Sequence, residues 1–353
     1  MKLYCPGVIP WRHTQALYHA LAGDGQEALV LCRPAERYVC LGFHDDLQQE
    51  VNLAYCNRHA IPLIRRETGG GMVLLDQDQV FFQLILHNSN PLLNGRRDRF
   101  FQQFLTPALA VLADFGLQAV FGPPADILVG GRKISGNGAG DINGYAVYIG
   151  NLLLGFDRRT MAGVFQSPDR CFSKYTEQSL GQNLTTMAEE LGCLPSPELV
   201  EKRLLHHFQK WLPSLTDGGD YRSLGSRLEQ AAVRLSSAEM LALPGKKRRQ
   251  RQVKIREGVY ARWHPWPGAP HQGAAMLVLR DGRIAQVSIV GQDILPPAAI
   301  PSFTAALTGI AWSGDSVREA IAEWRQSPAA GLAAAADEQL AAWILEGVSG
   351  EVG

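Results

Sequence analysis

Short apolar runs separated by polar turns recur through the first two thirds of the chain. Their length and the turn residues between them predict strands rather than helices. These predicted strands cover residues 28–32, 38–42, 61–65, 72–75, 79–86, 126–129, 133–135 and 145–156. Apolar residues at helical spacing predict helices over residues 14–22, 47–59, 99–116 and 197–212. The helices do not alternate regularly with the strands, so we expect an α+β domain rather than a series of βαβ units.

The pattern changes after about residue 215. A predicted helix over residues 227–242 leads into the basic run Lys246–Arg251. We interpret this run as a solvated linker, with a contact for an acidic partner as the alternative. Beyond it we predict two strands and two Ala-rich helices, at residues 274–280, 283–291, 299–324 and 330–346. Asp281-Gly282 between the strands is a hairpin signal. The predicted domains are a first domain, a helix with a basic linker, and a small α+β accessory domain, over residues 1–225, 226–252 and 253–353.

Composition and charge exclude several classes of protein. With 353 residues the chain is long enough for two domains, and 46% hydrophobic against 19% charged residues is an ordinary globular balance. The 34 basic residues balance 34 acidic ones, so we expect no nucleic-acid partner. We find neither a signal-peptide core nor a membrane-length apolar stretch, so we expect no membrane partner. Six scattered cysteines without a CxxC pair indicate reduced thiols, and the protein is predicted to be cytoplasmic.

The first candidate site is the segment Arg65–Gly71, with the sequence RRETGGG. Three consecutive glycines weaken a strand or a helix, but they let backbone N–H groups approach a ligand closely. The two arginines before them supply fixed positive charge suited to a phosphate or a carboxylate. A plain flexible turn is the alternative interpretation.

The second candidate site is the segment Gly130–Gly138, with the sequence GGRKISGNG. It lacks the spacing of a Walker A loop. Lys133 lies on a short predicted strand, and the Ser-Gly-Asn-Gly turn that follows places backbone groups beside its ammonium. A solvent-facing lysine is the ordinary interpretation of such a residue. Together with the first segment, however, it suggests two glycine-rich walls that bring cations to one anionic ligand.

These segments resemble the motifs of the lipoate–protein ligase family. The string RRETGGGMVLLD is similar to the family's RRxxGGGxVxHD, and ADILVGGRKISGNG is similar to its NDLxxxGrKxSGxA. YIGNLLL at residues 148–154 resembles the family's HHGTLLL, and QNLT at 182–185 resembles its TNL element. The resemblance covers residues 1–215, and the tail after residue 253 resembles the accessory domain of the long ligases. It implies a biotin/lipoate ligase-like catalytic domain with mixed or antiparallel sheets flanked by helices.

The resemblance also implies a two-step reaction that uses ATP and Mg²⁺. The lipoate carboxylate attacks the ATP α-phosphate to give lipoyl-AMP, and a lysine of a carrier protein then displaces AMP. Lys133 would be the catalytic residue, bridging acyl and phosphate oxygens, and Asp126 would lie near the nucleotide or its Mg²⁺. The residues implied to bind lipoyl-AMP or ATP are Arg65, Arg66, Gly69, Gly70, Gly71, Asp76, Asp126, Lys133, Ser135, Gly136, Asn137 and Gly150.

Several positions depart from the family motifs. Leu75, Tyr148 and Ile149 stand where the family often has histidine, and Ala125 stands where it has asparagine. Asp78-Gln79 stands where Gly-Asn is usual. These polar groups lie in the motifs around the implied acyl-adenylate site, so the choice between lipoate and octanoate stays open. Lys133 and both glycine segments remain, and an active enzyme is expected.

Three other functions remain as alternatives. Octanoyltransferases of the same superfamily use a nucleophilic cysteine shortly before the lysine motif, but residues 120–126 contain none and the nearest upstream cysteine is Cys56. A biotin ligase would share the fold but carries a different glycine signature. A non-catalytic lipoate-binding protein is the third.

The resemblance implies a lipoyl carrier protein as the partner. Candidates are an E2 lipoyl domain of a 2-oxoacid dehydrogenase, the glycine-cleavage H protein and a lipoyl carrier of sulfur metabolism. The accessory domain is expected to act as a mobile lid that helps the adenylation step.

Overall fold

The computed structural model describes residues 1–93, 97–247, 251–267, 273–291 and 294–346, apart from 329, 331, 332 and 334. The chain forms two compact units. The first contains Met1–Gln166 and Leu184–Lys247, and the second contains Ser167–Asn183 and Arg248–Gly353. The domain boundaries expected from the sequence stay a prediction, because compactness alone does not show which part folds independently.

The main sheet of the first unit is mixed. Its strands, in the spatial order β10, β11, β6, β2, β1 and β12, are Asn137–Ile142, Tyr145–Leu153, Gln79–His87, Ala28–Pro34, Lys2–Ile9 and Thr216–Asp217. β10, β11, β6 and β2 pair in antiparallel fashion, whereas β1 runs parallel to both β2 and β12. The unit is therefore an α+β structure, as expected.

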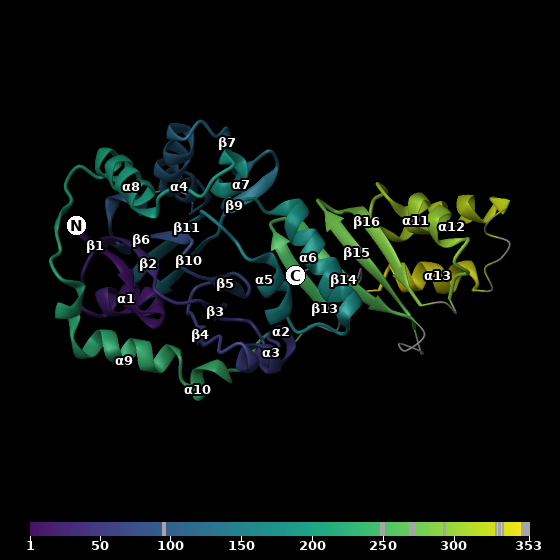
Figure 1. The fold of residues 1–353 in the computed structure, drawn as a ribbon, viewed down its shortest axis with the longest axis horizontal. Helices are drawn as coiled ribbons and strands as arrows, with labels where there is room; N and C mark the ends of the chain where they lie inside the picture. Colours follow the sequence, from purple (N-terminus) through teal and green to yellow (C-terminus); the bar gives the residue numbers. More distant parts are fainter. Residues whose placement is uncertain are drawn as a thin grey trace. The chain divides into compact units, whose positions relative to one another are not determined.

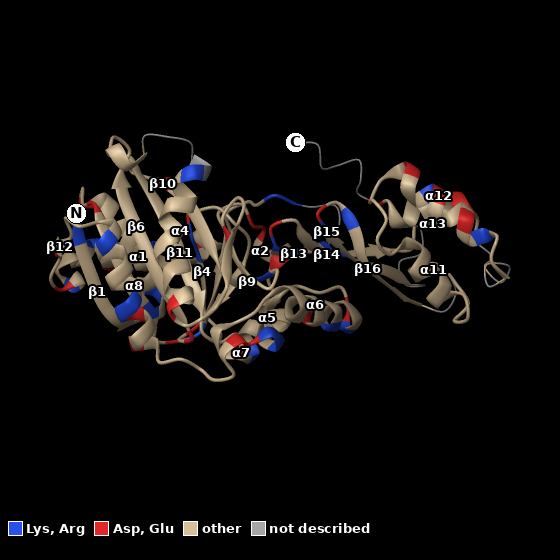
Figure 2. Ribbon diagram, turned by 90° about the horizontal axis from the view of Figure 1, so that it is seen from above, with Lys and Arg blue, Asp and Glu red and all other residues tan. Residues whose placement is uncertain are grey.

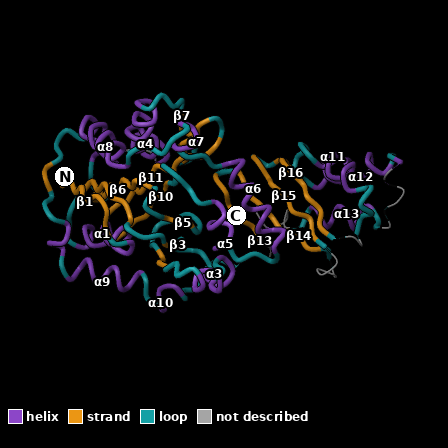
Figure 3. Tube along the Cα trace, viewed as in Figure 1, coloured by secondary structure: helices purple, strands orange, loops and turns teal. Residues whose placement is uncertain are grey.

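Helices cover both faces of this sheet (Figures 1 and 3). The helices are α1 and α9 on one face and α4 and α8 on the other, with bounds Trp11–Gly23, Ser226–Leu235, Arg97–Asp114 and Pro197–Trp211. Alternate residues of β6 enter the two cores, Phe81 and Ile85 with α1 and α9, Phe82 and Leu84 with α4 and α8. Because both faces are covered, this strand is nearly continuously apolar and was readily predicted.

Two small sheets carry the candidate motifs. Their strands, in spatial order, are β4 (Leu63–Arg65), β3 (Tyr38–Leu41) and β5 (Val73–Leu75), and β7 (Ala119–Gly122), β8 (Asp126–Val129) and β9 (Arg132–Ser135). The first glycine segment connects β4 to β5, which lie on either side of β3. Lys133 lies on β9, an antiparallel neighbour of β8.

Two predicted helices are each broken by a polar capping residue. The segment 47–59 forms α2 (Leu47–Glu50) and α3 (Leu53–Arg58), because the Asn52 side chain accepts a hydrogen bond from the backbone N–H of Tyr55 and starts a new helix. The segment 227–242 likewise forms α9 and α10 (Ala238–Leu241), where Ser237 caps the N–H of Met240. Short helices α5 (Arg158–Val164) and α7 (Met187–Leu191) complete the elements near the site.

The second unit contains an antiparallel four-stranded sheet. Its strands β13, β14, β15 and β16 are Arg251–Arg256, Val259–Pro265, Ala274–Arg280 and Arg283–Val290. Asp281 and Gly282, with φ of +49° and +74°, form the predicted hairpin turn. The predicted helix 299–324 is two helices. Among the described residues, the α-helices after the sheet are α11 (Ile300–Leu307), α12 (Gly314–Arg325) and α13 (Asp337–Ile344).

Both faces of this second sheet are covered. Leu277 and Leu279 of β15 enter a core with α11, α12 and α13. On the alternate face lies α6 (Arg170–Asn183), whose Phe172 ring packs edge-on against Trp263, with ring centroids 5.8 Å apart. The segment 167–183 thus belongs to the second unit although it lies within the motif-bearing part of the sequence.

The charged residues are of both signs in both units, with Lys and Arg interspersed among Asp and Glu (Figure 2). Residues 248–250 of the basic run lie outside the described residues, so its role as a linker stays a prediction. Among the described residues no helix has the length and apolar character needed to span a bilayer.

Candidate active site

The glycine-rich loop between β4 and β5 packs against strand β10. The backbone N–H of Gly69 donates to the carbonyl of Ala139 at 3.2 Å, and a Cβ added at Gly140 would lie 3.0 Å from the Thr68 side chain. The Gly70 carbonyl lies only 1.8 Å from where a Cβ at Gly42 would sit, so Gly42 must lack a side chain. A Cβ at Gly138 would lie 3.5 Å from the Gly69 carbonyl, so the first segment packs against the end of the second and the β10 residues that follow it.

The Arg65 guanidinium is fully buried and holds backbone carbonyls. It donates to Asp45 O and Leu241 O at 2.7 Å and to Met240 O at 2.9 Å, and also to the carbonyls of Gly42, Phe43 and Leu243. These contacts tie α10 to the loop after β3. Its N–H groups are thus occupied by backbone carbonyls, and the expectation that Arg65 lines an acyl-adenylate pocket stays a prediction.

Arg66 folds the glycine loop back on itself. Its guanidinium donates to Gly71 O at 2.8 Å, to Gly69 O at 3.0 and 3.2 Å, and to Cys40 O at 3.2 Å. It also lies 3.6 Å from the Cys40 sulfur. Burial raises the pKa of the Cys40 thiol, and the Arg66 charge offsets that effect only in part. The loop is thus a fixed structure and not a plain flexible turn.

Lys133 pairs with Asp126 across two adjacent strands. The Lys133 Nζ lies 2.7 Å from the Asp126 Oδ1, and the two side chains are 19% and 9% exposed. The pairing of β8 with β9 is irregular between Ile127 and Leu128, which places these two side chains together. A partly buried ammonium beside a carboxylate is a cation held at a fixed position.

The turn after Lys133 is fixed by a buried polar network. Ser135 Oγ donates to Asn137 Oδ1 at 3.1 Å, and Asn137 Nδ2 donates to the Ala125 carbonyl at 2.7 Å. The N–H of Gly136 donates to Asn151 Oδ1 at 2.6 Å, and Asn151 Nδ2 donates to Gln79 Oε1 at 2.6 Å. Asn151 and Gln79 were not predicted as site residues. The signal that could have identified them is the presence of a buried amide side chain in each of two otherwise apolar strands, β6 and β11.

Gly150 fits the fold by its lack of a side chain. A Cβ there would lie 2.3 Å from the Phe82 ring and 2.6 Å from Asn137 Oδ1. This position lets β11 approach both the core and the turn after Lys133. Its predicted contact with nucleotide stays a prediction, but its packing requirement is evident.

Asp76 joins a separate polar cluster. Its carboxylate is buried, accepts the Asp78 N–H at 3.1 Å and lies 3.6 Å from Arg37 Nε. Arg37 also lies 3.1 Å from Asp157 Oδ2. Burial raises the pKa of Asp76. The described contacts of Asp76 are therefore with Arg37 and its own turn rather than with Lys133.

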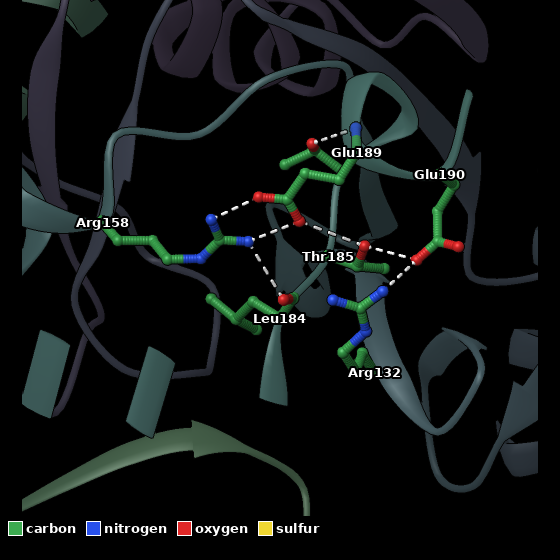
Figure 4. A network of polar contacts seen from close by, with 7 residues as sticks. Arg132, Arg158, Leu184, Thr185, Glu189 and Glu190 are labelled. Carbon is green, nitrogen blue, oxygen red and sulfur yellow. Dashed lines mark hydrogen bonds and ion pairs between the residues drawn. The ribbon is translucent and has the colours of Figure 1, made fainter. Parts of the chain in front are cut away.

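A network of charged residues fixes the segment 184–190 beside the lysine strand (Figure 4). Thr185 N–H donates to the Lys133 carbonyl at 2.9 Å. Glu190 accepts from Arg132 of β9 at 2.6 Å and from the Thr185 hydroxyl at 2.5 Å. Arg158 of α5 holds Glu189 with both terminal nitrogens and donates to the Leu184 carbonyl at 3.1 Å. Helices α5 and α7 thus hold the segment that bonds to the backbone of Lys133.

The carboxylates of the site do not form a metal cage. Among the described residues no three His, Cys, Asp or Glu side chains are grouped as a metal site would require. Mg²⁺ at nucleotide sites is commonly held by phosphates, waters and one or two carboxylates, and Asp126 fits that smaller requirement.

Comparison with known proteins agrees with this arrangement. The family model described as the lipoyl protein ligase A/B catalytic domain matches residues 7–209, more than half of the chain. The chain belongs to the lipoyl protein ligase A/B family. Both glycine segments, Lys133 and the network around residues 184–190 lie within the matched region. This chain is similar in sequence to lipoate ligases and octanoyltransferases.

Relatives of this lipoyl protein ligase A/B family member include both kinds of enzyme. Lipoate-protein ligase LplJ of Bacillus subtilis is 26% identical over 187 residues, 52% of this chain and 54% of the relative. Lipoate-protein ligase A of Bdellovibrio bacteriovorus is 24% identical over 318 residues, 86% of this chain and 85% of the relative. Octanoyltransferase LipM of Moorella thermoacetica is 22% identical over 228 residues, which are 58% of this chain and 81% of the relative. The aligned part of this chain spans about half the length of LplJ.

Solved structures show the fold. A bi-partite lipoate protein ligase from Thermoplasma acidophilum, studied with its E2 lipoyl domain, matches with a TM-score of 0.59 at 21% identity, covering 70% of this chain and 98% of that one. A lipoate-protein ligase A bound with ATP matches with a TM-score of 0.56 at 20% identity. The match covers 69% of this chain and 98% of that one. The biotin/lipoate ligase-like fold expected from the motifs is confirmed.

Proposed function

We propose that this protein is an ATP-dependent lipoate–protein ligase. The observation that carries the proposal is the packing of the first glycine segment against β10, a strand that begins within the second segment. The Gly69 N–H donates to the Ala139 carbonyl, and a Cβ at Gly138 would lie 3.5 Å from the Gly69 carbonyl. The glycine-rich loop thereby lies against the strand that follows Lys133 and its turn. This arrangement suits the oxygens of an acyl-adenylate, where negative charge develops in both steps.

In the first step, the lipoate carboxylate oxygen attacks the α-phosphorus of ATP, and the bond to pyrophosphate breaks. In the second, the amine of a carrier lysine attacks the acyl carbonyl, and AMP leaves with the electrons of the mixed anhydride bond. Lys133 would lie against the acyl and phosphate oxygens, and the backbone of Gly69, Gly70 and Gly71 and the turn Ser135-Gly136-Asn137 would line the pocket. Arg66 and Asn151 hold these two walls in place.

Mg²⁺ would supply charge neutralisation on the ATP phosphates. Asp126 is the residue proposed to lie near it, and its present partner Lys133 would then turn toward the phosphate oxygens. The ATP-bound ligase A of the same fold supports the nucleotide part of this proposal.

The acceptor in this proposal is a lysine on a lipoyl carrier protein in the cytoplasm. The Thermoplasma ligase studied with its E2 lipoyl domain supports a carrier of that kind. A glycine-cleavage H protein and a lipoyl carrier of sulfur metabolism remain alternatives, because no described surface separates them.

Octanoyl transfer is the second candidate, favoured by the similarity to LipM. A cysteine transferase needs a thiolate beside the acyl site. Cys40, which contacts Arg66 of the glycine loop, is fully buried, and its pKa is raised. Burial also raises the pKa of Cys56 to about 11. Neither thiol has the environment of a nucleophile, which supports the ligase.

Exchange of labelled pyrophosphate into ATP tests the proposal, with lipoate and octanoate compared as the acid. A ligase catalyses exchange that depends on the acid. Transfer of octanoyl groups between carriers without ATP would identify a transferase, and neither activity would identify a binding protein. Mass spectrometry of several apo carriers incubated with ATP, Mg²⁺ and either acid would then name the acceptor.

A further inference from the structure

Glu67 has contacts that no motif predicted. It lies inside the first glycine segment, directly after Arg66 and two residues before Gly69. Arg234 of α9 donates to both of its carboxylate oxygens at 2.8 Å, in a bidentate pair. His19 Nδ1 of α1 lies 3.1 Å from the same carboxylate. The glycine loop is thus held from outside by two helices that are distant in sequence.

Arg65 and Glu67 reach the same segment of the chain. Arg65 holds the carbonyls of Met240, Leu241 and Leu243 around α10, and Glu67 holds Arg234 on α9. Arg66, between them, bonds instead to carbonyls of its own loop. The side chains of Arg65 and Glu67, two residues apart, therefore both bond to the segment 226–243. We call this segment the strap.

We propose that the strap sets the position of the glycine-rich loop, with Glu67 and Arg234 as positioning residues for acyl-acid binding. The proposal rests on the proposed function, because the loop is taken as the wall of the acyl-adenylate pocket. Glu67 and Arg234 need touch no substrate. They act through the loop, by keeping the backbone of Gly69, Gly70 and Gly71 where a ligand meets it.

The charges around the pair are consistent with a fixed clamp. The hydrogen bonds from Arg234 and then His19 lower the pKa of Glu67, so this carboxylate is ionised at neutral pH. Burial lowers the pKa of His19, so the neutral ring donates from Nδ1 to Glu67. A bidentate Arg–carboxylate pair fixes direction as well as distance.

The same helix offers a matched control. Arg227 of α9 donates to Asp24 Oδ1 and to the Gly23 carbonyl at the end of α1, so it joins α9 to α1 without touching the loop. Its side chain is 55% exposed and that of Arg234 is 49% exposed. Removing either arginine therefore breaks an attachment of α9, but only R234A removes the bidentate partner of Glu67.

The test measures KM for lipoate in pyrophosphate exchange, together with amide hydrogen exchange of Gly69–Gly71 in the free protein. If release of Glu67 lowers the competent loop population to about a tenth, R234A raises KM about tenfold. The kcat of R234A should stay within about twofold of the wild-type value, because the loop regains its order once the ligand is bound. Hydrogen exchange of the loop should become faster. R227A should change neither KM nor the hydrogen exchange of the loop. R234K should show smaller changes in both quantities than R234A.

A double-mutant cycle between Glu67 and Arg234 is a second test, and it can be interpreted even if the variants are less stable than the wild type. If Glu67 and Arg234 act as one unit, E67Q/R234A should be no worse than the poorer single variant. Additive effects, or equal changes in R227A and R234A, overturn the proposal. The hydrogen-exchange comparison needs no catalytic activity, so it decides the role of the strap even if the wild-type protein catalyses no exchange and the proposed function fails.

Discussion

At the scale of single residues, the glycines of the site have different reasons to be glycine. A Cβ at Gly150 would meet the Phe82 ring at 2.3 Å, whereas a Cβ at Gly71 would meet nothing within 4 Å. The backbone of Gly71 is not in the left-handed region. Gly150 is therefore required by packing, and Gly71 is free of that requirement and remains available for a ligand.

G150A should lower the free energy of unfolding by about 2 kcal/mol, because overpacking a filled core forces its neighbours to move. G71A should change it by less than about 0.5 kcal/mol. Chemical denaturation of both variants checks this. A G150A protein as stable as the wild type would show that β11 can shift without loss, and the packing argument would be wrong.

At the scale of elements, polar side chains inside buried strands join the site together. Asn151 of β11 contacts Gln79 of β6 and the backbone of Gly136 between β9 and β10. One amide therefore links the main sheet to the turn after Lys133. Removing it takes the acceptor from the Gly136 N–H and the donor from the buried Gln79 Oε1.

N151A should destabilise the protein by about 1–3 kcal/mol through those unsatisfied groups. It should also reduce pyrophosphate exchange, since the turn after Lys133 loses its anchor. The double variant Q79L/N151L, which removes both amides, should recover some stability but not activity. Recovery of both would place the turn outside the site.

The elements also show which features a sequence pattern can predict. The apolar runs at 28–32 and 79–86 predicted β2 and β6 because both strands are buried. Strand β10, with the sequence NGAGDI, was missed because Gly138 and Gly140 face the glycine loop in place of apolar side chains. Lys133 was predicted from its motif. Glu67 was not, because its partners His19 and Arg234 are distant in the sequence.

At the scale of the whole molecule, the two units divide the chain in a way that no pattern predicted. The spacing of apolar residues shows that α6 has a buried face, but not which sheet covers it. In the structure, Phe172 and Tyr175 of α6 are buried in the second unit, and the Tyr175 hydroxyl donates to the Gln286 carbonyl at 3.3 Å. The segment between Gln166 and Leu184 therefore depends on residues after 250.

Truncation after residue 247 should uncover that apolar face. We expect the truncated chain to bind a hydrophobic dye and to aggregate, because α6 loses the sheet that buries it. Adding residues 251–353 in trans should suppress dye binding, and so should F172S/Y175S in the truncated chain. A truncated protein that is monomeric and binds no dye would contradict this assignment of α6. Whether the accessory part also acts as a lid can be read from the adenylation rate of the same samples.

The second unit should also lose stability in acid. His264 is buried, with Nδ1 3.2 Å from the Trp343 carbonyl, and burial lowers its pKa from 6.5 to about 4. Between these values the unfolded chain binds a proton that the folded unit does not. The free energy of unfolding therefore falls as pH decreases from 6.5 to 4, by up to about 1.4 kcal/mol per pH unit. Thermal denaturation of wild type and H264Q checks this: H264Q should show a flatter dependence, and identical slopes would refute it.

We propose that this protein makes an acyl-adenylate with Lys133 as the catalytic cation. The most direct measurement is lipoate-dependent exchange of labelled pyrophosphate into ATP by wild type, K133A and K133R, with K254A as a control. Lys254 is a lysine of the second unit that pairs with Glu257 at its surface. We predict exchange by wild type and K254A, a loss of about 100-fold or more in K133A, and little recovery in K133R, with circular dichroism unchanged. Exchange at the wild-type rate in a folded K133A protein, or none in the wild type, would contradict it.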